Sequence, residues 1–419
     1  MEGEHRQGAD GVRTGKWMES GPGADGKSGS SCLWLDKEMK VVYDKVGDGI
    51  RILRCFGYDE QVELPERIGG LAVTELGPYV FSEVVRRRAP GQKYLAEVTE
   101  GQSDQTKDTT CGREADRREP AGWHMDEAAI EPTASDEDLV GAGALADGTP
   151  VLKGDVLRSV CLPKSLRKIG AYAFYNCSRL ERLDIPDSLQ DLGAGLFTGC
   201  CGVRHLTICM APGKTSCLKE ILAELKQTLR VDLLGEDGGL KAKLLFPEYY
   251  EESIENTPAR LLTQEMHGCG HRYRNAFNGT EFQYLTYDKL FPHIQVQEKP
   301  ELVTELVLGR LLYPVQLMED RRQIYEAYAA SHGREIVKIA EREKDLALLR
   351  AAAKASWCKT ACLEEMLEEG RMAKDPQALG ILMDIRRRKR PKESMDPAEG
   401  AEGDGVPAWQ PKRQRRFRL

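Results

Sequence analysis

The sequence predicts an α+β protein: a short β-solenoid with an N-terminal hairpin cap, followed by a mainly α-helical domain. Three observations support this fold class. A phrase of apolar, glycine and proline residues recurs in the middle of the chain, two alternating apolar runs precede its first copy, and apolar residues at helical spacing dominate residues 298–390. A repeat unit of this kind cannot bury its apolar side alone, so consecutive copies are expected to stack as coils.

The repeat is clearest in two segments, SVCLPKSLRKIGAYAFYNC (159–177) and RLDIPDSLQDLGAGLFTGC (182–200), which align without gaps after 23 residues. Self-similarity at a period of about 20–30 residues is typical of a solenoid coil of leucine-rich-repeat size. An earlier copy, VELPERIGGLAVTELGPYVF (62–81), carries five extra residues between its proline and its glycine. We interpret that addition as a small turn around Gly69 and Gly70 in a modified first coil.

The strand that opens each coil carries polar side chains on its outer side. Side chains alternate in direction along a strand, so Val160, Leu183 and Leu206 face the core and their neighbours face outward. These neighbours form two series, here called the outward ladders: Gln61, Ser159, Arg182 and His205 in the first, and Glu63, Cys161, Asp184 and Thr207 in the second. A rigid polar surface without a deep pocket suits a protein partner better than a small substrate. The alternative is that these side chains are merely solvated.

Composition and apolar patterning predict the structure of the segments before and between the coils. Residues 1–31 are rich in glycine, serine and charge without periodicity, which predicts disorder. Residues 32–82 are expected to hold the first repeat and, in MKVVYDKVGDGIRILRCFG (39–57), a hairpin that covers the end of the solenoid core. Residues 83–155 are polar and lack a sustained period, so we expect a disordered insertion, which a solenoid turn tolerates because loop closure entropy grows slowly with length.

The pattern changes after the repeats of residues 156–216. Residues 217–297 combine a helical apolar face with strand-like runs, which predicts a mixed α/β segment. Residues 298–390 are expected to be helical. Within them Lys-Asp recurs at 344–345 and 374–375, each time before an apolar run. This recurrence leaves two arrangements open, ankyrin-like helix pairs or an ordinary helical bundle, since the T-P-L-H signature of ankyrin repeats is missing.

The repeat phrase, written as L-x-x-L-x-I-P-x-S-L-x-x-I-G-x-x-A-F-x-x-C, resembles the BspA-type leucine-rich repeats, which are found mainly in bacteria and some protists. The resemblance covers residues 40–82 and 156–209. It implies a surface or binding protein and not an enzyme. The sequence departs from the family pattern in its small number of coils, its long interruption and its unrelated C-terminal half.

The sequence contains few motifs that indicate catalysis, phosphate binding or metal binding. The chain contains no phosphate-binding loop, no G-x-S-x-G elbow and no H-E-x-x-H helix. The weak metal candidate is His267-Gly268-Cys269-Gly270-His271, because alternation in an extended segment would place His267, Cys269 and His271 on one side and such side chains bind zinc. No fourth ligand is near, and the glycines equally indicate a turn. We therefore expect no catalytic residues, no metal and no cofactor.

Net charge and the search for targeting signals narrow the range of possible functions. A formal net charge of −7 argues against a general nucleic-acid binder. The first residues lack the apolar region of a secretory signal, and no stretch of 18 apolar residues occurs, so we expect a cytoplasmic protein with reduced cysteines and no membrane contact. Two basic blocks, at 386–392 and 412–418, lie at and beyond the last helix; residues 391–419 are expected to be a disordered basic tail.

These observations together predict a non-enzymatic protein-interaction or scaffold protein that uses the solenoid surface and the helical region to bind a protein partner. Two alternatives remain. The basic tail could bind nucleic acid through charge, or residues 240–390 could hold an enzyme site that no known motif reveals.

Overall fold

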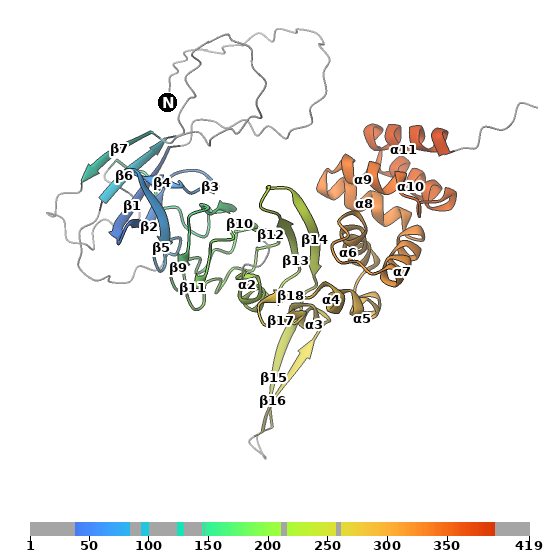
Figure 1. The fold of residues 1–419 in the computed structure, drawn as a ribbon, viewed down its shortest axis with the longest axis horizontal. Coiled ribbons are helices and arrows are strands. Elements are labelled where there is room, and N and C mark those ends of the chain that lie inside the picture. The colour runs from blue at the N-terminus through green and yellow to red at the C-terminus, as the bar shows by residue number, and fades with distance from the viewer. Residues whose placement is uncertain are drawn as a thin grey trace, which may run out of the picture. The chain divides into compact units, whose positions relative to one another are not determined.

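The computed structural model describes residues 38–83, 94–99, 124–129, 145, 147–210, 216–256 and 261–389. All of them belong to one compact unit that spans Glu38–Leu419. The predicted disorder of residues 1–31 and 391–419 lies outside the described residues. Figure 1 shows the order of the elements within this unit, from the N-terminal strands to the C-terminal helices. None of the described helices is both long and apolar enough to cross a bilayer.

The solenoid coils open with strands of a six-stranded sheet, here called the ladder sheet. Its strands, in spatial order, are β3 (Gln61–Glu63), β8 (Ser159–Cys161), β10 (Arg182–Ile185), β12 (His205–Cys209), β13 (Leu229–Leu234) and β14 (Leu240–Phe246). Neighbours from β3 to β13 are parallel, because each coil returns the chain to the same side, whereas β14 turns back antiparallel to β13. The predicted leucine-rich-repeat solenoid is thus confirmed.

A second sheet forms the other side of the solenoid and carries the cap. Its order is β11 (Asp191–Leu192), β9 (Lys168–Ile169), β5 (Leu71–Leu76), β2 (Gly49–Phe56) and β1 (Glu38–Val46), followed by β6 and β7. The predicted hairpin is formed by β1 and β2. Because β2 pairs in parallel with β5, Ile50 and Ile52 join the solenoid core and cover its N-terminal end. The small turn at Gly69 and Gly70 also forms, between β4 (Arg67–Ile68) and β5.

The prediction of a disordered insertion at 83–155 is wrong for part of that segment. β6 (Tyr94–Thr99) pairs antiparallel with β1, and β7 (His124–Ala129) pairs with β6. The physical reason is that β1 would otherwise be an edge strand, whose unpaired backbone groups offer hydrogen bonds to any extended segment nearby. Leu145 and Val151 pack with Phe56 in a separate apolar cluster, so the end of the insertion is ordered as well. The remaining insertion residues lie outside the described part of the chain.

The recurring phenylalanines and cysteines explain why the phrase is repeated. Phe81, Phe174 and Phe197 stack through the core with ring centroids 5.3 and 5.7 Å apart. The thiol of Cys177 donates to the carbonyl oxygen of Phe81 at 3.6 Å, and that of Cys200 donates to Phe174 at 2.9 Å. Each coil therefore contacts the preceding coil through the same two side chains, which gives both residues a packing role.

The recurring glycines are required by the closeness of the coils. A Cβ atom added to Gly170 would lie 2.4 Å from the backbone nitrogen of Pro78, and one added to Gly193 would lie 2.1 Å from that of Ala171. Backbone atoms cannot move aside as a flexible side chain can. Any larger residue at these two positions would therefore force neighbouring coils apart.

Residues 217–297 fold as short helices and strands around the end of the solenoid. They comprise α2 (Leu218–Glu224), β13 and β14, β15 (Tyr250–Asn256), β16 (Leu261–His267), α3 (Gly270–Arg274), β17 (Phe277–Asn278), β18 (Glu281–Phe282), α4 (Tyr284–Lys289) and α5 (Phe291–Gln297). The buried guanidinium of Arg274 donates to the carbonyl oxygens of Leu225, Gln227, Pro247 and Gly270. One side chain thus ties three segments of backbone together, at residues 225–227, 247 and 270.

The helical region begins with α6 (Pro300–Leu312), which lies directly against the solenoid. A Cβ atom on Gly309 would lie 2.7 Å from the carbonyl oxygen of Lys243 in β14, so only glycine permits this approach. The next residue, Arg310, is fully buried and forms two 2.8 Å hydrogen bonds with Asp288 of α4. The Tyr325 hydroxyl donates to the same carboxylate at 3.0 Å. These contacts fix the position of α6 relative to the ladder sheet.

After α7 (Glu319–Ala330), the last four described helices form two equivalent hairpins. The first joins α8 (Gly333–Glu343) to α9 (Leu346–Lys354), and the second joins α10 (Thr360–Ala373) to α11 (Pro376–Lys389). Each hairpin turns at a lysine in the left-handed conformation, Lys344 or Lys374, followed by an aspartate that caps the next helix, Asp345 or Asp375. Because α8 packs on α10 and α9 on α11, the Lys-Asp recurrence marks the turns of two stacked helix pairs.

Candidate functional site

The structure brings the eight residues of the outward ladders together in register. Gln61, Ser159, Arg182 and His205 are consecutive partners across β3, β8, β10 and β12, and Glu63, Cys161, Asp184 and Thr207 form the neighbouring row. The residues between the two rows, Val62, Val160, Leu183 and Leu206, are buried in the core. Alternation along each strand therefore places both rows on the outer face, as the sequence predicted.

Strands β13 and β14 extend the ladders beyond the sequence prediction. Arg230 lies opposite His205, Asp232 lies opposite Thr207, and Lys243 of β14 lies opposite Asp232. The repeat phrase ends before β13, so a search for that phrase does not find these residues. The signal that does reveal them is the alternation in LRVDLL, which continues the pattern of the preceding strands.

Neighbouring ladder residues interact with one another. Arg182 Nε lies 3.3 Å from Asp184 Oδ1, and Arg182 Nη2 donates to Thr207 Oγ1 at 3.1 Å. His205 Nε2 lies 3.1 Å from Asp232 Oδ2. Burial raises the pKa of the Asp232 carboxyl, but the hydrogen bond with His205 and the positive charges of His205, Lys243 and Arg182 together outweigh burial. The net pKa therefore lies below its ordinary value. The ladder surface is thus a preorganised set of alternating charges.

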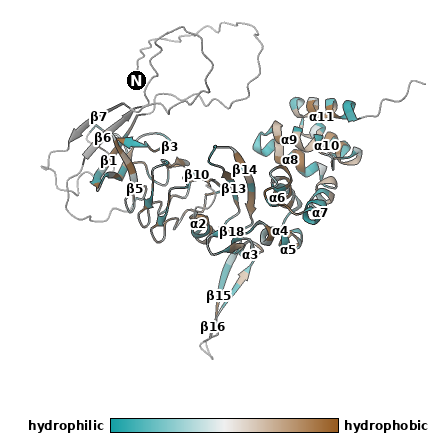
Figure 2. Ribbon diagram, viewed as in Figure 1, coloured by the Kyte–Doolittle hydropathy of each residue, from teal (hydrophilic) through white to brown (hydrophobic). Residues whose placement is uncertain are grey.

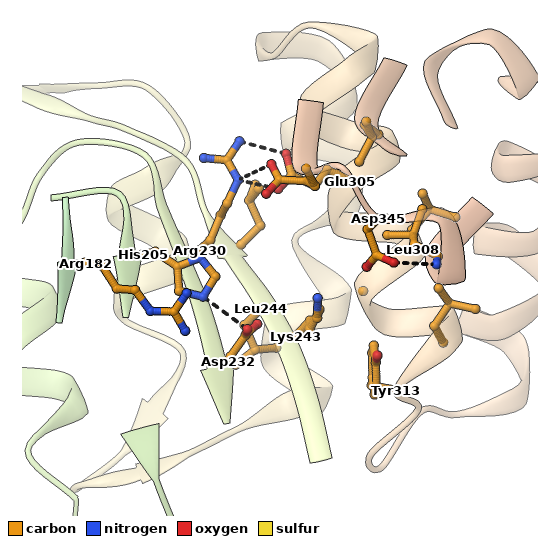
Figure 3. Close-up of a pocket in the computed structure, with 16 residues that line it drawn as sticks. Arg182, His205, Arg230, Asp232, Lys243, Leu244, Glu305, Leu308, Tyr313 and Asp345 are labelled. Carbon is orange, nitrogen blue, oxygen red and sulfur yellow. Dashed lines mark hydrogen bonds and ion pairs between the residues drawn. The ribbon is translucent and has the colours of Figure 1, made fainter. Parts of the chain in front are cut away.

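A cleft of about 250 Å³ opens where the ladder sheet meets the helices. Figure 3 shows its two sides, with Arg182, His205 and Asp232 on one and Leu308, Tyr313 and Asp345 on the other. The helical side has an apolar part, formed by Leu308 and Leu312 of α6, Ile339 of α8 and Leu348 of α9, and it also carries the carboxylates of Glu305, Glu343 and Asp345. The strand side is polar. This cleft is smaller than most small-molecule sites, which hold about 300–1,000 Å³.

Most charged groups around the cleft have a described hydrogen-bond or ion-pair partner. Arg230 forms two hydrogen bonds with Glu305, at 2.5 and 2.9 Å, and Asp345 accepts the backbone N–H of Leu348 at 2.8 Å. Lys243 differs, since no hydrogen bond or ion pair joins its ammonium to another described residue, although its positive charge helps to lower the pKa of the neighbouring Asp232. Its Nζ lies 5.8 Å from the centre of the Tyr313 ring. Lys243 is therefore a cation that an incoming anionic group can neutralise.

The ladder thiol is unsuited to nucleophilic catalysis. Burial, together with the negative charges of Asp184 and Glu63, raises the pKa of Cys161 to about 12. A catalytic cysteine needs the opposite environment, an electropositive one that favours the thiolate at neutral pH. Cys161 thus belongs to the surface as a small side chain of intermediate exposure.

The three side chains of the weak zinc candidate do not point toward a common position. We expected His267, Cys269 and His271 in one extended segment, but His267 ends β16, Cys269 precedes α3 and His271 lies within α3. Their side chains have separate partners: His267 pairs with Glu252, Cys269 donates to Glu298 at 3.9 Å, and His271 contacts Asn275. The cause is Gly268, whose φ of +89° turns the chain out of the strand. Among the described residues no three side chains are grouped as metal ligands.

The first basic block is largely engaged within the protein. Arg386 pairs with Glu364, Arg387 and Arg388 pair with Asp384, and Lys389 donates to the carbonyl oxygens of Ala355 and Cys358. The second block, at 412–418, lies outside the described residues.

Comparisons with known proteins agree with the repeat architecture. Residues 152–221 match the family model of the BspA type leucine rich repeat region (6 copies). A search of solved structures found the crystal structure of a T. pallidum leucine rich repeat protein, 20% identical, covering 41% of this chain and 72% of that chain. Its TM-score of 0.15 is too low to carry an argument. A search of curated proteins found no match.

Proposed function

We propose that this chain, whose residues 152–221 form a BspA-type leucine-rich-repeat region, is a non-enzymatic binding protein that holds a protein partner on its outward ladders. The supporting observation is the register of polar and charged side chains from β3 to β14, on a backbone fixed by stacked coils. A rigid surface that binds without rearrangement loses little conformational entropy on association.

The cleft at the end of the ladders supplies an anchor for the same partner. Its volume suits a side chain better than a whole cofactor, and its apolar wall meets a polar wall that contains Lys243. Protein interfaces concentrate their binding energy in a few side chains buried in such pockets. We therefore assign the cleft to an apolar partner side chain that lies next to a carboxylate.

Support for this function over the two alternatives is specific. The raised pKa of the Cys161 thiol argues against a cysteine nucleophile on the ladders themselves, and the described cations of the first basic block already have protein partners. We also propose a cytoplasmic location, which rests on the ten described cysteines all being free thiols. A gel shift that depends on salt concentration would favour nucleic-acid binding instead.

The decisive test exchanges charges on the ladder. The paired change Arg182→Glu and Asp184→Lys inverts the charges that the surface presents while keeping opposite charges next to each other. The partner is first recovered by affinity capture with the full chain and then titrated calorimetrically. We expect at least a tenfold loss of affinity, because like charges across an interface are strongly unfavourable.

A matched control lies on the opposite sheet of the same solenoid. Lys168 and Asp191 form an exposed 2.7 Å ion pair between β9 and β11. The exchange Lys168→Asp with Asp191→Lys should leave both the affinity and the melting temperature unchanged. Equal affinity of the wild-type chain and the Arg182/Asp184 variant would move the partner site off the outward ladders.

A further inference from the structure

The hairpin of β15 and β16 is a two-stranded ribbon that no other described strand joins. It forms its own sheet, in register from Tyr250 opposite His267 to Asn256 opposite Leu261. Figure 1 shows it projecting from the elements around its base. Side chains 251–255 and 262–266 are all exposed. Isolated two-stranded ribbons are marginal in water, so a third strand would add substantially to its stability.

The base of the ribbon, by contrast, is firmly held. Gly268 and Gly270 sit so close to the 247–248 backbone that a Cβ atom on Gly270 would lie 2.0 Å from the Pro247 carbonyl oxygen. Lys226 pairs with Glu251 at 2.9 Å, and the buried Arg274 donates to the carbonyl oxygen of Pro247. A rigid base under an exposed ribbon fixes the direction in which the ribbon's edges point.

Both faces of the ribbon combine apolar and acidic side chains. Paired residues share a face, so one face carries Tyr250 and Ile254 with two glutamates, and the other carries Leu262 and Met266 with two more. The four apolar side chains are 59%, 42%, 66% and 42% exposed, respectively. A partner packed on one face would leave the other uncovered, whereas a strand added at an edge places side chains beside both.

The charges identify the edge and the occupant. Strands 250–256 and 261–267 contain four glutamates and neither lysine nor arginine, and three of the four, Glu251, Glu252 and Glu255, lie on β15. Figure 2 shows β15 as largely hydrophilic. We propose that the free edge of β15 binds an extended, basic peptide segment of a partner protein by strand addition. Backbone hydrogen bonds supply affinity in this mode, and flanking side chains supply specificity.

A second copy of the chain is the less suitable occupant. Pairing β15 with β15 of another copy would bring glutamates opposite glutamates, and like charges directly opposite one another destabilise a strand pair. A strand of alternating apolar and basic residues would instead place its basic side chains beside Glu251 and Glu255 on one face and its apolar side chains beside Tyr250 and Ile254 on the other. This surface is separate from the outward ladders, so failure of either proposal leaves the other untouched.

The test uses the full chain and a fluorescein-labelled octapeptide of alternating valine and lysine. Fluorescence anisotropy should show binding that weakens at least tenfold in the variant Glu252→Lys with Glu255→Lys. Hydrogen exchange should show new protection of amides in residues 250–256. Two comparison peptides complete the design: one with a central proline, which interrupts strand pairing, and one with glutamate in place of lysine. Both should bind at least tenfold more weakly.

Control variants separate strand addition from general attraction. Glu236→Lys with Glu281→Lys makes the same change in net charge at exposed positions outside the ribbon, and should bind the peptide as the wild type does. The Arg182/Asp184 exchange should also leave peptide binding intact. Equal binding of the proline peptide, an equal loss in the Glu236/Glu281 variant, or no binding of the valine–lysine peptide would each overturn the proposal. Dimerisation through the ribbon, seen by sedimentation, would replace it with self-association.

Discussion

Arg230 of β13 and Glu305 of α6 are joined by two hydrogen bonds, at 2.5 and 2.9 Å, that link the ladder sheet to the helical region. Their side chains are only 22% and 14% exposed. Glu305 also accepts a 2.6 Å hydrogen bond from Arg342 of α8. One carboxylate therefore neutralises two arginines from different parts of the fold, and it does so at the rim of the proposed anchor cleft.

The change Glu305→Gln should destabilise the chain by about 1.5–3 kcal/mol, the range for hydrogen bonds to charged groups. It removes the least exposed carboxylate between Arg230 and Arg342, and leaves them only the more exposed Glu343 and Glu301. Urea unfolding measures this loss. The control is Glu301→Gln, which removes a more exposed partner of Arg342 and should cost at most about 1 kcal/mol. Equal losses of unfolding free energy in the two variants would show that Glu305 stabilises the chain no more than the exposed Glu301 does.

Replacing a phenylalanine of the core stack by alanine should strongly lower the free energy of unfolding. Phe174 has an aromatic neighbour on both sides and no solvent exposure, so Phe174→Ala should lower the unfolding free energy by about 3–5 kcal/mol, and Phe197→Ala by a similar amount. Thermal melts of the full chain test this. Tyr58→Ala, at an exposed position, should shift stability by no more than about 0.5 kcal/mol. Melts unchanged in both phenylalanine variants would contradict their place in the core.

The sequence predicted the repeats well because each coil must satisfy the same contacts. Gly193, Phe197 and Cys200 recur for stacking reasons that act within a single period, and the family match at residues 152–221 confirms the resemblance. β6 and β7 were missed because β6 pairs with an existing edge, β1, β7 pairs with β6, and neither carries a repeating pattern of its own. Tertiary pairing of this kind overrides weak local preferences.

Only the ladder part of the candidate site could be predicted, because it follows from local strand alternation, whereas the cleft depends on tertiary contacts. Strand alternation gives the direction of Arg182 and Asp184, but it cannot show that α6 approaches β14 at Gly309 and closes a cleft beside Lys243. That approach depends on contacts between residues far apart in sequence. The zinc candidate failed because a single glycine, Gly268, ends the strand that its geometry required.

Thiol reactivity should distinguish a packing role from a catalytic one. Because the pKa of Cys161 is raised to about 12, its thiolate is scarce at pH 8, and alkylation by iodoacetamide should be at least about a hundredfold slower than at exposed Cys201. The rate at Cys161 should rise about tenfold for each pH unit while the chain stays folded. Peptide mass mapping follows both sites. Equal rates at pH 8 would contradict the packing role of Cys161 and would indicate an activated thiol on the ladders, since nucleophilic catalysis needs an accessible thiolate.

Alanine substitutions at two glycines, Gly193 and Gly380, should change the unfolding free energy in opposite directions. At Gly193 the new Cβ would lie 2.1 Å from the backbone nitrogen of Ala171, so Gly193→Ala should destabilise the chain by about 1–3 kcal/mol or more, as overpacking of a close contact does. At Gly380, on the exposed side of α11, nothing lies within 4 Å, and Gly380→Ala should stabilise by up to about 1 kcal/mol through helix propensity. Urea unfolding of both variants in parallel measures the difference. A neutral Gly193→Ala would mean that the coils stand farther apart than the stacked phenylalanines and thiol contacts require.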